Sequence, residues 1–134
     1  MQTVKPITTL TNLLTKNNFE VKEVQKNKSI IAMKKGFPRL YFEIAKNCII
    51  VRNIKELNDK AIKESNVLLT AINDLNKGAL LSKYYLQPDN KLYVEAVLVN
   101  AGNEKEFAVM INIIKNDMKQ LLDNYKPMKK FISH

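Results

Sequence analysis

Four short stretches between residues 19 and 54 alternate apolar and polar side chains, and this period of two constrains the fold more than any other feature of the chain. Such alternation is typical of β-strands that bury one face. Polar turns separate the stretches, which favours an antiparallel meander of consecutive strands. The predicted strands span residues 19–25, 29–35, 39–45 and 48–54.

Helical periodicity occurs before and after these strands. Residues 6–16 and 65–78 each carry a stripe of apolar side chains at helical spacing, and residues 103–125 continue one apolar face over about five turns. Asn17 and Asn18 are expected to end the first of these helices, because both tolerate left-handed dihedrals. Asn103 and Glu106 have the spacing of a capping box at the start of the last helix, and Pro127 is expected to end it. A second hairpin is predicted from residues 80–86 and 91–99, whereas residues 55–63 show no clear pattern.

The predicted elements follow the order α-β-β-β-β-α-β-β-α. An antiparallel sheet with helices packed on it is the economical arrangement for that order, so the predicted class is α+β. A chain of 134 residues is long enough for one domain with one core. We expect that domain to span residues 1–126, followed by a short basic C-terminal tail at residues 127–134.

The counts of histidine and cysteine bear most directly on catalysis. The chain has one histidine, His134, which is its last residue, and one cysteine, Cys48. A Ser-His-Asp or Cys-His pair would have to use the terminal residue, and a zinc site built from His and Cys would lack ligands. The three glycines are isolated, so there is no glycine-rich phosphate loop. We expect no enzyme activity, no metal and no cofactor.

Location is predicted from what the sequence lacks. A lone cysteine cannot form an internal disulfide, which is typical of the reducing cytoplasm. Residues 1–12 are polar without the continuous apolar core of a signal peptide, and no apolar run approaches the roughly 20 residues that span a bilayer. We therefore expect a cytoplasmic protein without membrane insertion.

Three carboxylates were candidates for acid–base chemistry: Glu43, Asp89 and Glu95. Glu43 and Glu95 lie in the middle of predicted strands, where exposed carboxylates that pair with lysine are the favoured interpretation. Cys48 begins an apolar strand close to Lys46, and a buried or half-buried structural thiol is favoured there over a reactive one.

The net charge of +9 indicates an anionic partner or a bias in composition. Residues 1–60 hold 12 basic and 5 acidic side chains, whereas residues 61–134 hold 10 and 8. The excess is nearly all lysine, whereas specific phosphate or base recognition favours arginine, so a solvated lysine surface is the simpler interpretation. The candidate anion-binding residues are Lys34, Lys35, Arg39 and Arg52.

Tyrosines on the predicted strands are the candidate partner-binding residues. They lie near lysines, and aromatic rings interleaved with cations on a sheet can stack nucleic-acid bases. Tyrosine is equally common at protein interfaces. The candidates are Tyr41, Tyr84, Tyr85 and Tyr93.

A family resemblance rests on the second half of the chain. The helix end at residues 71–76, the hairpin with Asp89 and Asn90 at its turn, residues 93–96 and the long closing helix resemble the YbjN-like family. That family is similar in fold to the type III secretion chaperones. Asn73 and Asn76 match its motif, and we expect them to cap the helix end and the following turn.

The resemblance implies an α+β sandwich without enzyme activity that is frequently dimeric. In the chaperone relatives, an extended client segment covers apolar patches and pairs with sheet edges. Secretion chaperones tend to be acidic, whereas this chain is basic. A different, acidic partner therefore fits this chain as well as a secretion client does. We expect a homodimer that binds an unidentified protein or peptide client, and the alternative is a nucleic-acid-associated protein that uses the basic N-terminal half.

Overall fold

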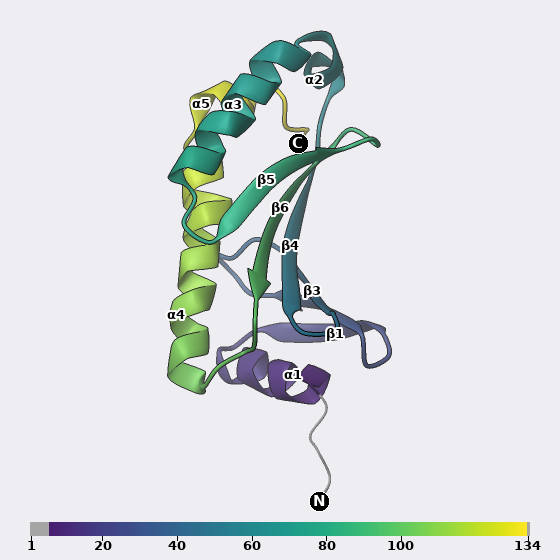
Figure 1. The fold of residues 1–134 in the computed structure, drawn as a ribbon, viewed down its shortest axis with the longest axis vertical. Coiled ribbons are helices and arrows are strands. Elements are labelled where there is room, and N and C mark those ends of the chain that lie inside the picture. The colour runs from purple at the N-terminus through teal and green to yellow at the C-terminus, as the bar shows by residue number, and fades with distance from the viewer. Residues whose placement is uncertain (1–5, 134) are drawn as a thin grey trace, which may run out of the picture.

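One six-stranded sheet with helices packed on it makes up the fold (Figure 1), which a computed structural model describes for residues 6–133. The strands are β1 (Glu20–Gln25), β2 (Ser29–Met33), β3 (Leu40–Ile44), β4 (Ile49–Glu56), β5 (Ser82–Gln87) and β6 (Lys91–Leu98). The helices are α1 (Pro6–Lys16), α2 (Asp59–Lys63), α3 (Ser65–Gly78), α4 (Glu104–Lys115), the π-helix η1 (Asn116–Leu121) and α5 (Lys126–Lys129). The α+β class and the antiparallel sheet are confirmed, and α2 and α5 are additions to the predicted order.

The strand order is β1-β2-β3-β4-β6-β5, and every neighbouring pair is antiparallel. The first four strands form the predicted meander. The hairpin of β5 and β6 then joins it through β6, which pairs with the whole of β4 and leaves β5 at the edge. This register aligns Tyr41, Arg52 and Glu95 across three neighbouring strands.

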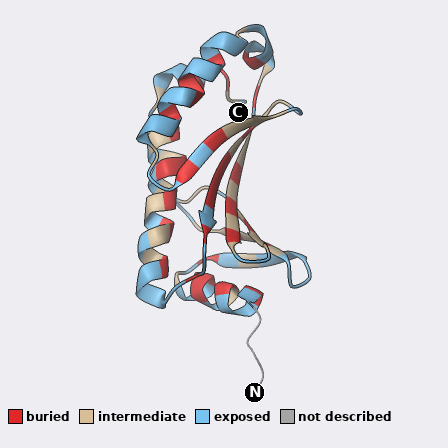
Figure 2. Ribbon diagram, viewed as in Figure 1, coloured by how far each residue is buried: buried red, intermediate tan, exposed pale blue. Residues whose placement is uncertain are grey.

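The helices cover one face of the sheet. Ile49, Val51 and Asn53 of β4 are buried, while the residues between them are half-buried, so the strand alternates as predicted. Buried side chains from α1, α3, α4 and η1 belong to the same apolar cluster as the buried side chains of the strands. In Figure 1, α3 and α4 lie beside the strands and α1 lies below β1, and Figure 2 shows buried residues on the sides where helices and strands meet. We call the opposite side of the sheet the open face.

Local sequence signals end and begin the helices as expected. Asn18 adopts a φ of 68°, the left-handed conformation that asparagine tolerates, and α1 ends just before it. At the start of α4, the Asn103 side chain accepts a hydrogen bond from the backbone N–H of Glu106 at 2.8 Å. This bond satisfies one of the N–H groups that have no partner within the helix.

The predicted span 103–125 implied one regular α-helix, but the closing helix is not regular throughout. It changes from α4 to the π-helix η1 at Asn116. A wider π turn shifts the side chains around the helix axis, and both Asp117 and Met118 are buried although they are adjacent in sequence. The apolar periodicity of the sequence carries no signal for a buried aspartate, which is why the π turn was not predicted.

The last residues pack on the domain, so the predicted boundary at residue 126 needs correction. Pro127 lies in the first turn of α5, where its missing N–H costs nothing, instead of only ending the preceding helix. Met128 and Phe131 are fully buried, and Ile132 forms a bridge with Leu57. Residues 127–133 therefore belong to the domain, with Met128 and Phe131 in its core and the lysines and the serine exposed.

Candidate functional site

Three of the four candidate tyrosines lie on the open face. Alternation along the strands places Tyr41 of β3, Tyr85 of β5 and Tyr93 of β6 on this side, and all three are half-buried. The rings of Tyr85 and Tyr93 are tilted with 5.6 Å between their centroids. The aliphatic side chains that share the open face are Ile31, Ile50, Ile54 and Val97. Tyrosine rings beside aliphatic groups are typical of surfaces that contact proteins.

Tyr84 lies on the other side of β5 and is buried, so it is not available to a partner. Its hydroxyl donates a hydrogen bond to the backbone carbonyl of Asp117. Burial, together with the nearby carboxylate of Asp117, raises the pKa of Tyr84 well above its ordinary range. Tyr84 therefore anchors β5 to the closing helix.

Arg52 links the two strand carboxylates on the open face. Its Nε donates to Oε1 of Glu95 at 2.8 Å, and its Nη1 lies 3.7 Å from Oε2 of Glu43. Glu95 also accepts from the Tyr85 hydroxyl at 2.9 Å, and Lys83 Nζ lies 3.1 Å from its second oxygen. The two carboxylates thus do face the same cation, although the sequence spacing did not require it.

This network keeps Glu95 ionised. Burial, which leaves its side chain 8% exposed, pushes the pKa upward, but the hydrogen bonds from Arg52, Lys83 and Tyr85 outweigh burial and lower the net pKa. Burial and the bond to Glu95 raise the pKa of Tyr85. Burial alone would lower the pKa of Arg52, but its hydrogen bond and charge pairing with Glu95 outweigh burial and raise that pKa overall. Chemically, the network holds charges in place and does not supply a proton donor near neutral pH.

A shallow hollow of about 180 Å³ lies next to this network on the open face. Its lining includes Tyr41, Arg52, Ile54 and Tyr93, which come from three strands. The hollow therefore combines aromatic, aliphatic and charged groups in the centre of the uncovered sheet.

The outer edge of β5 is occupied by side chains of the same chain. Asn76 of α3 accepts from the N–H of Tyr84 at 2.7 Å and donates to its C=O at 3.0 Å, as a neighbouring strand would. The predicted role of Asn76 as a cap for its own helix is thus replaced by a contact with β5. Because these backbone groups are already paired, an added client strand cannot pair with β5 at this position.

Asp117 is a buried acidic residue that the sequence reading missed. It is 3% exposed, and its carboxylate accepts hydrogen bonds from three consecutive backbone N–H groups, those of Leu80, Leu81 and Ser82, at 2.8–2.9 Å. These bonds fix the connection between α3 and β5. They also hold Leu80 in an outward position, where its side chain is 79% exposed.

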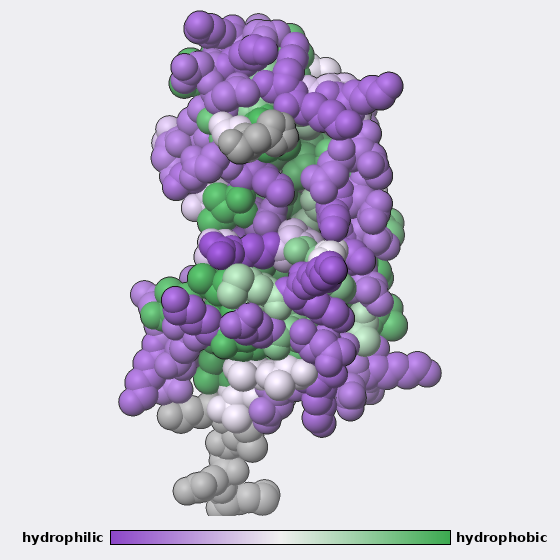
Figure 3. Space-filling model, turned by 180° about the vertical axis from the view of Figure 1, so that it is seen from behind, coloured by the Kyte–Doolittle hydropathy of each residue, from purple (hydrophilic) through white to green (hydrophobic). Residues whose placement is uncertain are grey.

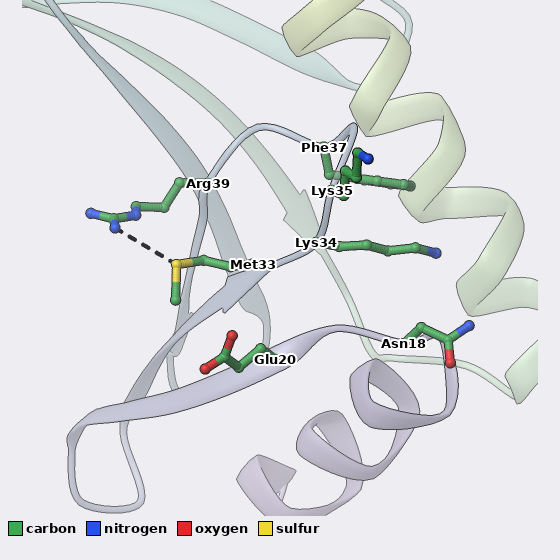
Figure 4. A pocket seen from close by; sticks show the side chains of 7 residues that line it. All are labelled: Asn18, Glu20, Met33, Lys34, Lys35, Phe37 and Arg39. Atoms are coloured by element: carbon green, nitrogen blue, oxygen red, sulfur yellow. Dashed lines mark hydrogen bonds between the residues drawn. The ribbon is translucent and has the colours of Figure 1, made fainter.

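A second candidate region surrounds the turn between β2 and β3. An open pocket of about 420 Å³ is lined there by Asn18, Glu20, Met33, Lys34, Lys35, Phe37 and Arg39. Figure 4 shows Lys34 and Phe37 extending toward the closing helix, whereas Arg39, Met33 and Glu20 point to the opposite side. The pocket brings together three of the four candidate anion-binding residues, but it divides them between two sides. Arg52, the fourth, is held in the network with Glu95.

Two lysines of the closing helix join Lys34 at this turn. Lys34 Nζ lies 4.9 Å from the centroid of the Phe37 ring, and Lys115 Nζ lies 4.6 Å from the same centroid. Lys119 Nζ donates to the backbone carbonyl of Gly36 at 2.9 Å. We call Lys34, Lys35, Lys115 and Lys119 the turn cluster. Lys115 and Lys119 were not predicted, because only the tertiary fold brings the closing helix to this turn.

Cys48 is half-buried immediately before β4, within the range of burial predicted for a structural thiol. It lines an open hollow of about 390 Å³ together with Lys46 and Val99. Across residues 6–133, no three His, Cys, Asp or Glu side chains lie close enough together to hold a metal ion. No helix in that same part of the chain is both long and apolar enough to cross a membrane.

Comparison with known proteins identifies the fold. No protein-family model and no curated protein matches the sequence. A crystal structure of YbjN from E. coli, described as a candidate transcription regulator, superimposes with a TM-score of 0.76 at 18% sequence identity. The alignment covers 99% of this chain and 100% of that one. The chain has a YbjN-like fold. The YbjN-like fold predicted from the sequence is confirmed, and the predicted resemblance already covered most of the chain.

Proposed function

We propose that this YbjN-like chain is a non-catalytic protein-binding module that receives its partner on the open face of the sheet. The observation that carries the proposal is the uncovered set of tyrosine and aliphatic side chains around Tyr93 and Ile54, which no helix covers among the described residues. Single exposed apolar residues are ordinary, but an apolar patch with a polar rim is typical of interaction sites.

The surface as a whole supports a binding role. Seen from behind, separate hydrophobic patches lie between the two ends of the molecule, with hydrophilic side chains among them (Figure 3). The charged groups at the centre of the open face, Glu43, Arg52, Lys83 and Glu95, are already paired with one another. A partner would therefore gain apolar contacts there without leaving a charge unpaired. The half-buried lone thiol of Cys48 is consistent with a cytoplasmic location for such a module.

Affinity capture with paired variants tests the proposal. The open-face variant Ile54→Thr/Tyr93→Thr keeps residues that favour strands but removes apolar area. The control variant Val67→Thr/Val109→Thr removes exposed apolar area from helices α3 and α4 instead. We expect a protein captured from the native host by the unmodified chain to be retained by the control and lost with the open-face variant. Equal capture by both variants, with unchanged thermal unfolding, would contradict a partner on the open face.

Homodimer formation is a separate proposal. The resemblance to frequently dimeric proteins supports it, and static light scattering over a range of concentrations measures it directly. A particle mass of twice 15.4 kDa would support a dimer, whereas 15.4 kDa at every concentration would exclude one.

Association with nucleic acid is the second candidate function. The turn cluster favours it, because its lysines converge on one turn and none lies within 4.0 Å of a carboxylate among residues 6–133. The description of the neighbouring YbjN structure as a candidate transcription regulator is consistent with this function. Salt-dependent binding of DNA or RNA tests it.

A further inference from the structure

We infer that the turn cluster binds the phosphate groups of a nucleic-acid backbone. The inference rests on the second candidate function and is independent of the open face. It begins with the placement of like charges: Lys34 approaches the turn at Gly36 and Phe37 from β2, and Lys115 and Lys119 approach it from the closing helix. The chain thus gathers three ammonium groups at one turn, with Lys35 beside them.

These positive charges are not compensated by nearby acids. The ion pairs among residues 6–133 use other lysines, namely Lys16, Lys83, Lys91 and Lys130. Glu20 lines the pocket, but it points away from Lys34 toward the side of Arg39 (Figure 4). Asp117 lies between the two helix lysines in sequence, but its carboxylate is buried against the connection before β5. An anion is therefore the complement that this surface lacks.

The cluster is ordered by its own contacts. Lys34 Nζ donates to the carbonyl of Asn17 at 2.9 Å and lies near the rings of both Phe19 and Phe37. The ring of Phe37 packs edge-on against the ring of Phe19, with 5.0 Å between their centroids, and this contact holds the turn in place. Side chains that are already positioned lose less conformational entropy when a ligand binds.

Residue type distinguishes nucleic acid from an acidic protein as the ligand. Lysine is depleted at protein–protein interfaces, whereas protein–nucleic acid interfaces are strongly positive. The fork of arginine suits carboxylate and phosphate alike, and the ammonium of lysine contacts phosphate as a point charge without bidentate geometry. Cations already lie near the Phe37 ring, so base stacking on that ring is not part of the site. The expected binding is to the backbone and does not depend on sequence.

Fluorescence anisotropy tests the site. The probe is labelled single-stranded DNA of about 20 nucleotides, longer than the roughly 4–16 nucleotides that one OB-fold domain covers. The test variant is Lys115→Gln/Lys119→Gln. The matched control, Lys60→Gln/Lys63→Gln, makes the same change of charge on α2. The variant Lys115→Arg/Lys119→Arg keeps the charge at the proposed site.

We expect the unmodified chain to bind the DNA probe at about 50 mM salt, and we expect the affinity to fall steeply as the salt is raised toward about 200 mM. The test variant should bind the probe more weakly. The slope of log K against log salt concentration should also be shallower by about 1.4, because each of the two lost phosphate contacts removes about 0.7 from the slope. The control and arginine variants should behave like the unmodified chain.

Three outcomes would overturn the inference. These are absence of binding at low salt, an equal loss in the control variant, and tighter binding of polyglutamate than of DNA through the same lysines. The last outcome would assign the cluster to an acidic polypeptide. If the double variant does not fold by circular dichroism, Lys115→Gln alone keeps the hydrogen bond from Lys119 to Gly36 and decides the same question.

Discussion

The side-chain amide of Asn76 forms two hydrogen bonds with the backbone of Tyr84, at 2.7 and 3.0 Å. It satisfies the backbone N–H and C=O of Tyr84, which the edge strand β5 would otherwise leave unpaired. Exposed strand edges are templates for aggregation, and proteins commonly cover them. In this chain, one asparagine of α3 blocks the edge of β5 at Tyr84.

Replacement of Asn76 by alanine should therefore lower stability and expose an edge. We expect Asn76→Ala to reduce the free energy of unfolding by about 1–3 kcal/mol, because a backbone N–H and a C=O lose their partners. Urea denaturation measures the loss, and light scattering detects any self-association. Asn73→Ala, on the exposed side of the same helix, is the control and should change stability by about 0.5 kcal/mol or less.

Removal of the Asp117 charge should loosen the connection that carries Leu80. Asparagine at position 117 keeps one carbonyl oxygen and replaces the other acceptor with a donor, which opposes the backbone N–H groups. We expect Asp117→Asn to cost about 1.5–3 kcal/mol, the range for hydrogen bonds to charged groups. Amide hydrogen exchange should become faster at Leu81 and Ser82, and it should change less in β4. Unchanged exchange at these amides would show that Asp117 does not hold the connection.

The acid limb of the stability curve should depend on Glu95. Its pKa in the folded chain lies below the ordinary value of 4.5, so folding favours the charged form. The resulting stabilisation is complete above the unfolded pKa and is lost as the pH falls through the folded pKa. We expect Glu95→Gln to flatten the loss of stability that the unmodified chain shows below about pH 4.5.

The control for this pH effect uses the same arginine. Glu43→Gln removes the longer ion pair of Arg52, 3.7 Å against 2.8 Å, and should leave the acid limb close to that of the unmodified chain. Urea denaturation at a series of pH values measures both variants. If Glu43→Gln flattens the curve as much as Glu95→Gln does, the stabilisation belongs to Arg52 and its surroundings as a whole.

The C-terminal residues should be required for stability. Phe131 is fully buried, and we expect Phe131→Ala to destabilise the chain by about 3–5 kcal/mol through lost burial and the cavity left behind. Thermal and chemical unfolding measure this change. Lys129→Ala, an exposed substitution in α5, should stay within about 0.5 kcal/mol of the unmodified chain. If Phe131→Ala and Lys129→Ala have equal stability, the original prediction of a tail at residues 127–134 would be supported instead.

Residues that act locally were the ones that could be predicted. The period of two in β2 to β4, the cap at Asn103 and the stop at Asn18 all depend on neighbours a few positions away. The side chains of the candidate sites could be placed only in part. Tyr41, Tyr85 and Tyr93 share a face as strand alternation allows, but Tyr84 follows the same rule onto the opposite side.

The amino-acid sequence by itself determined the strands, the main helices and the α+β class, because hydrophobic periodicity and turn residues act along the chain. Tertiary structure alone decided that Arg52 lies between Glu43 and Glu95, and that Lys119 reaches Gly36 from 83 positions away. The physical reason is that such contacts depend on strand register and on which helix face meets the sheet. Both are set when the whole apolar core is buried at once, and no local preference encodes them.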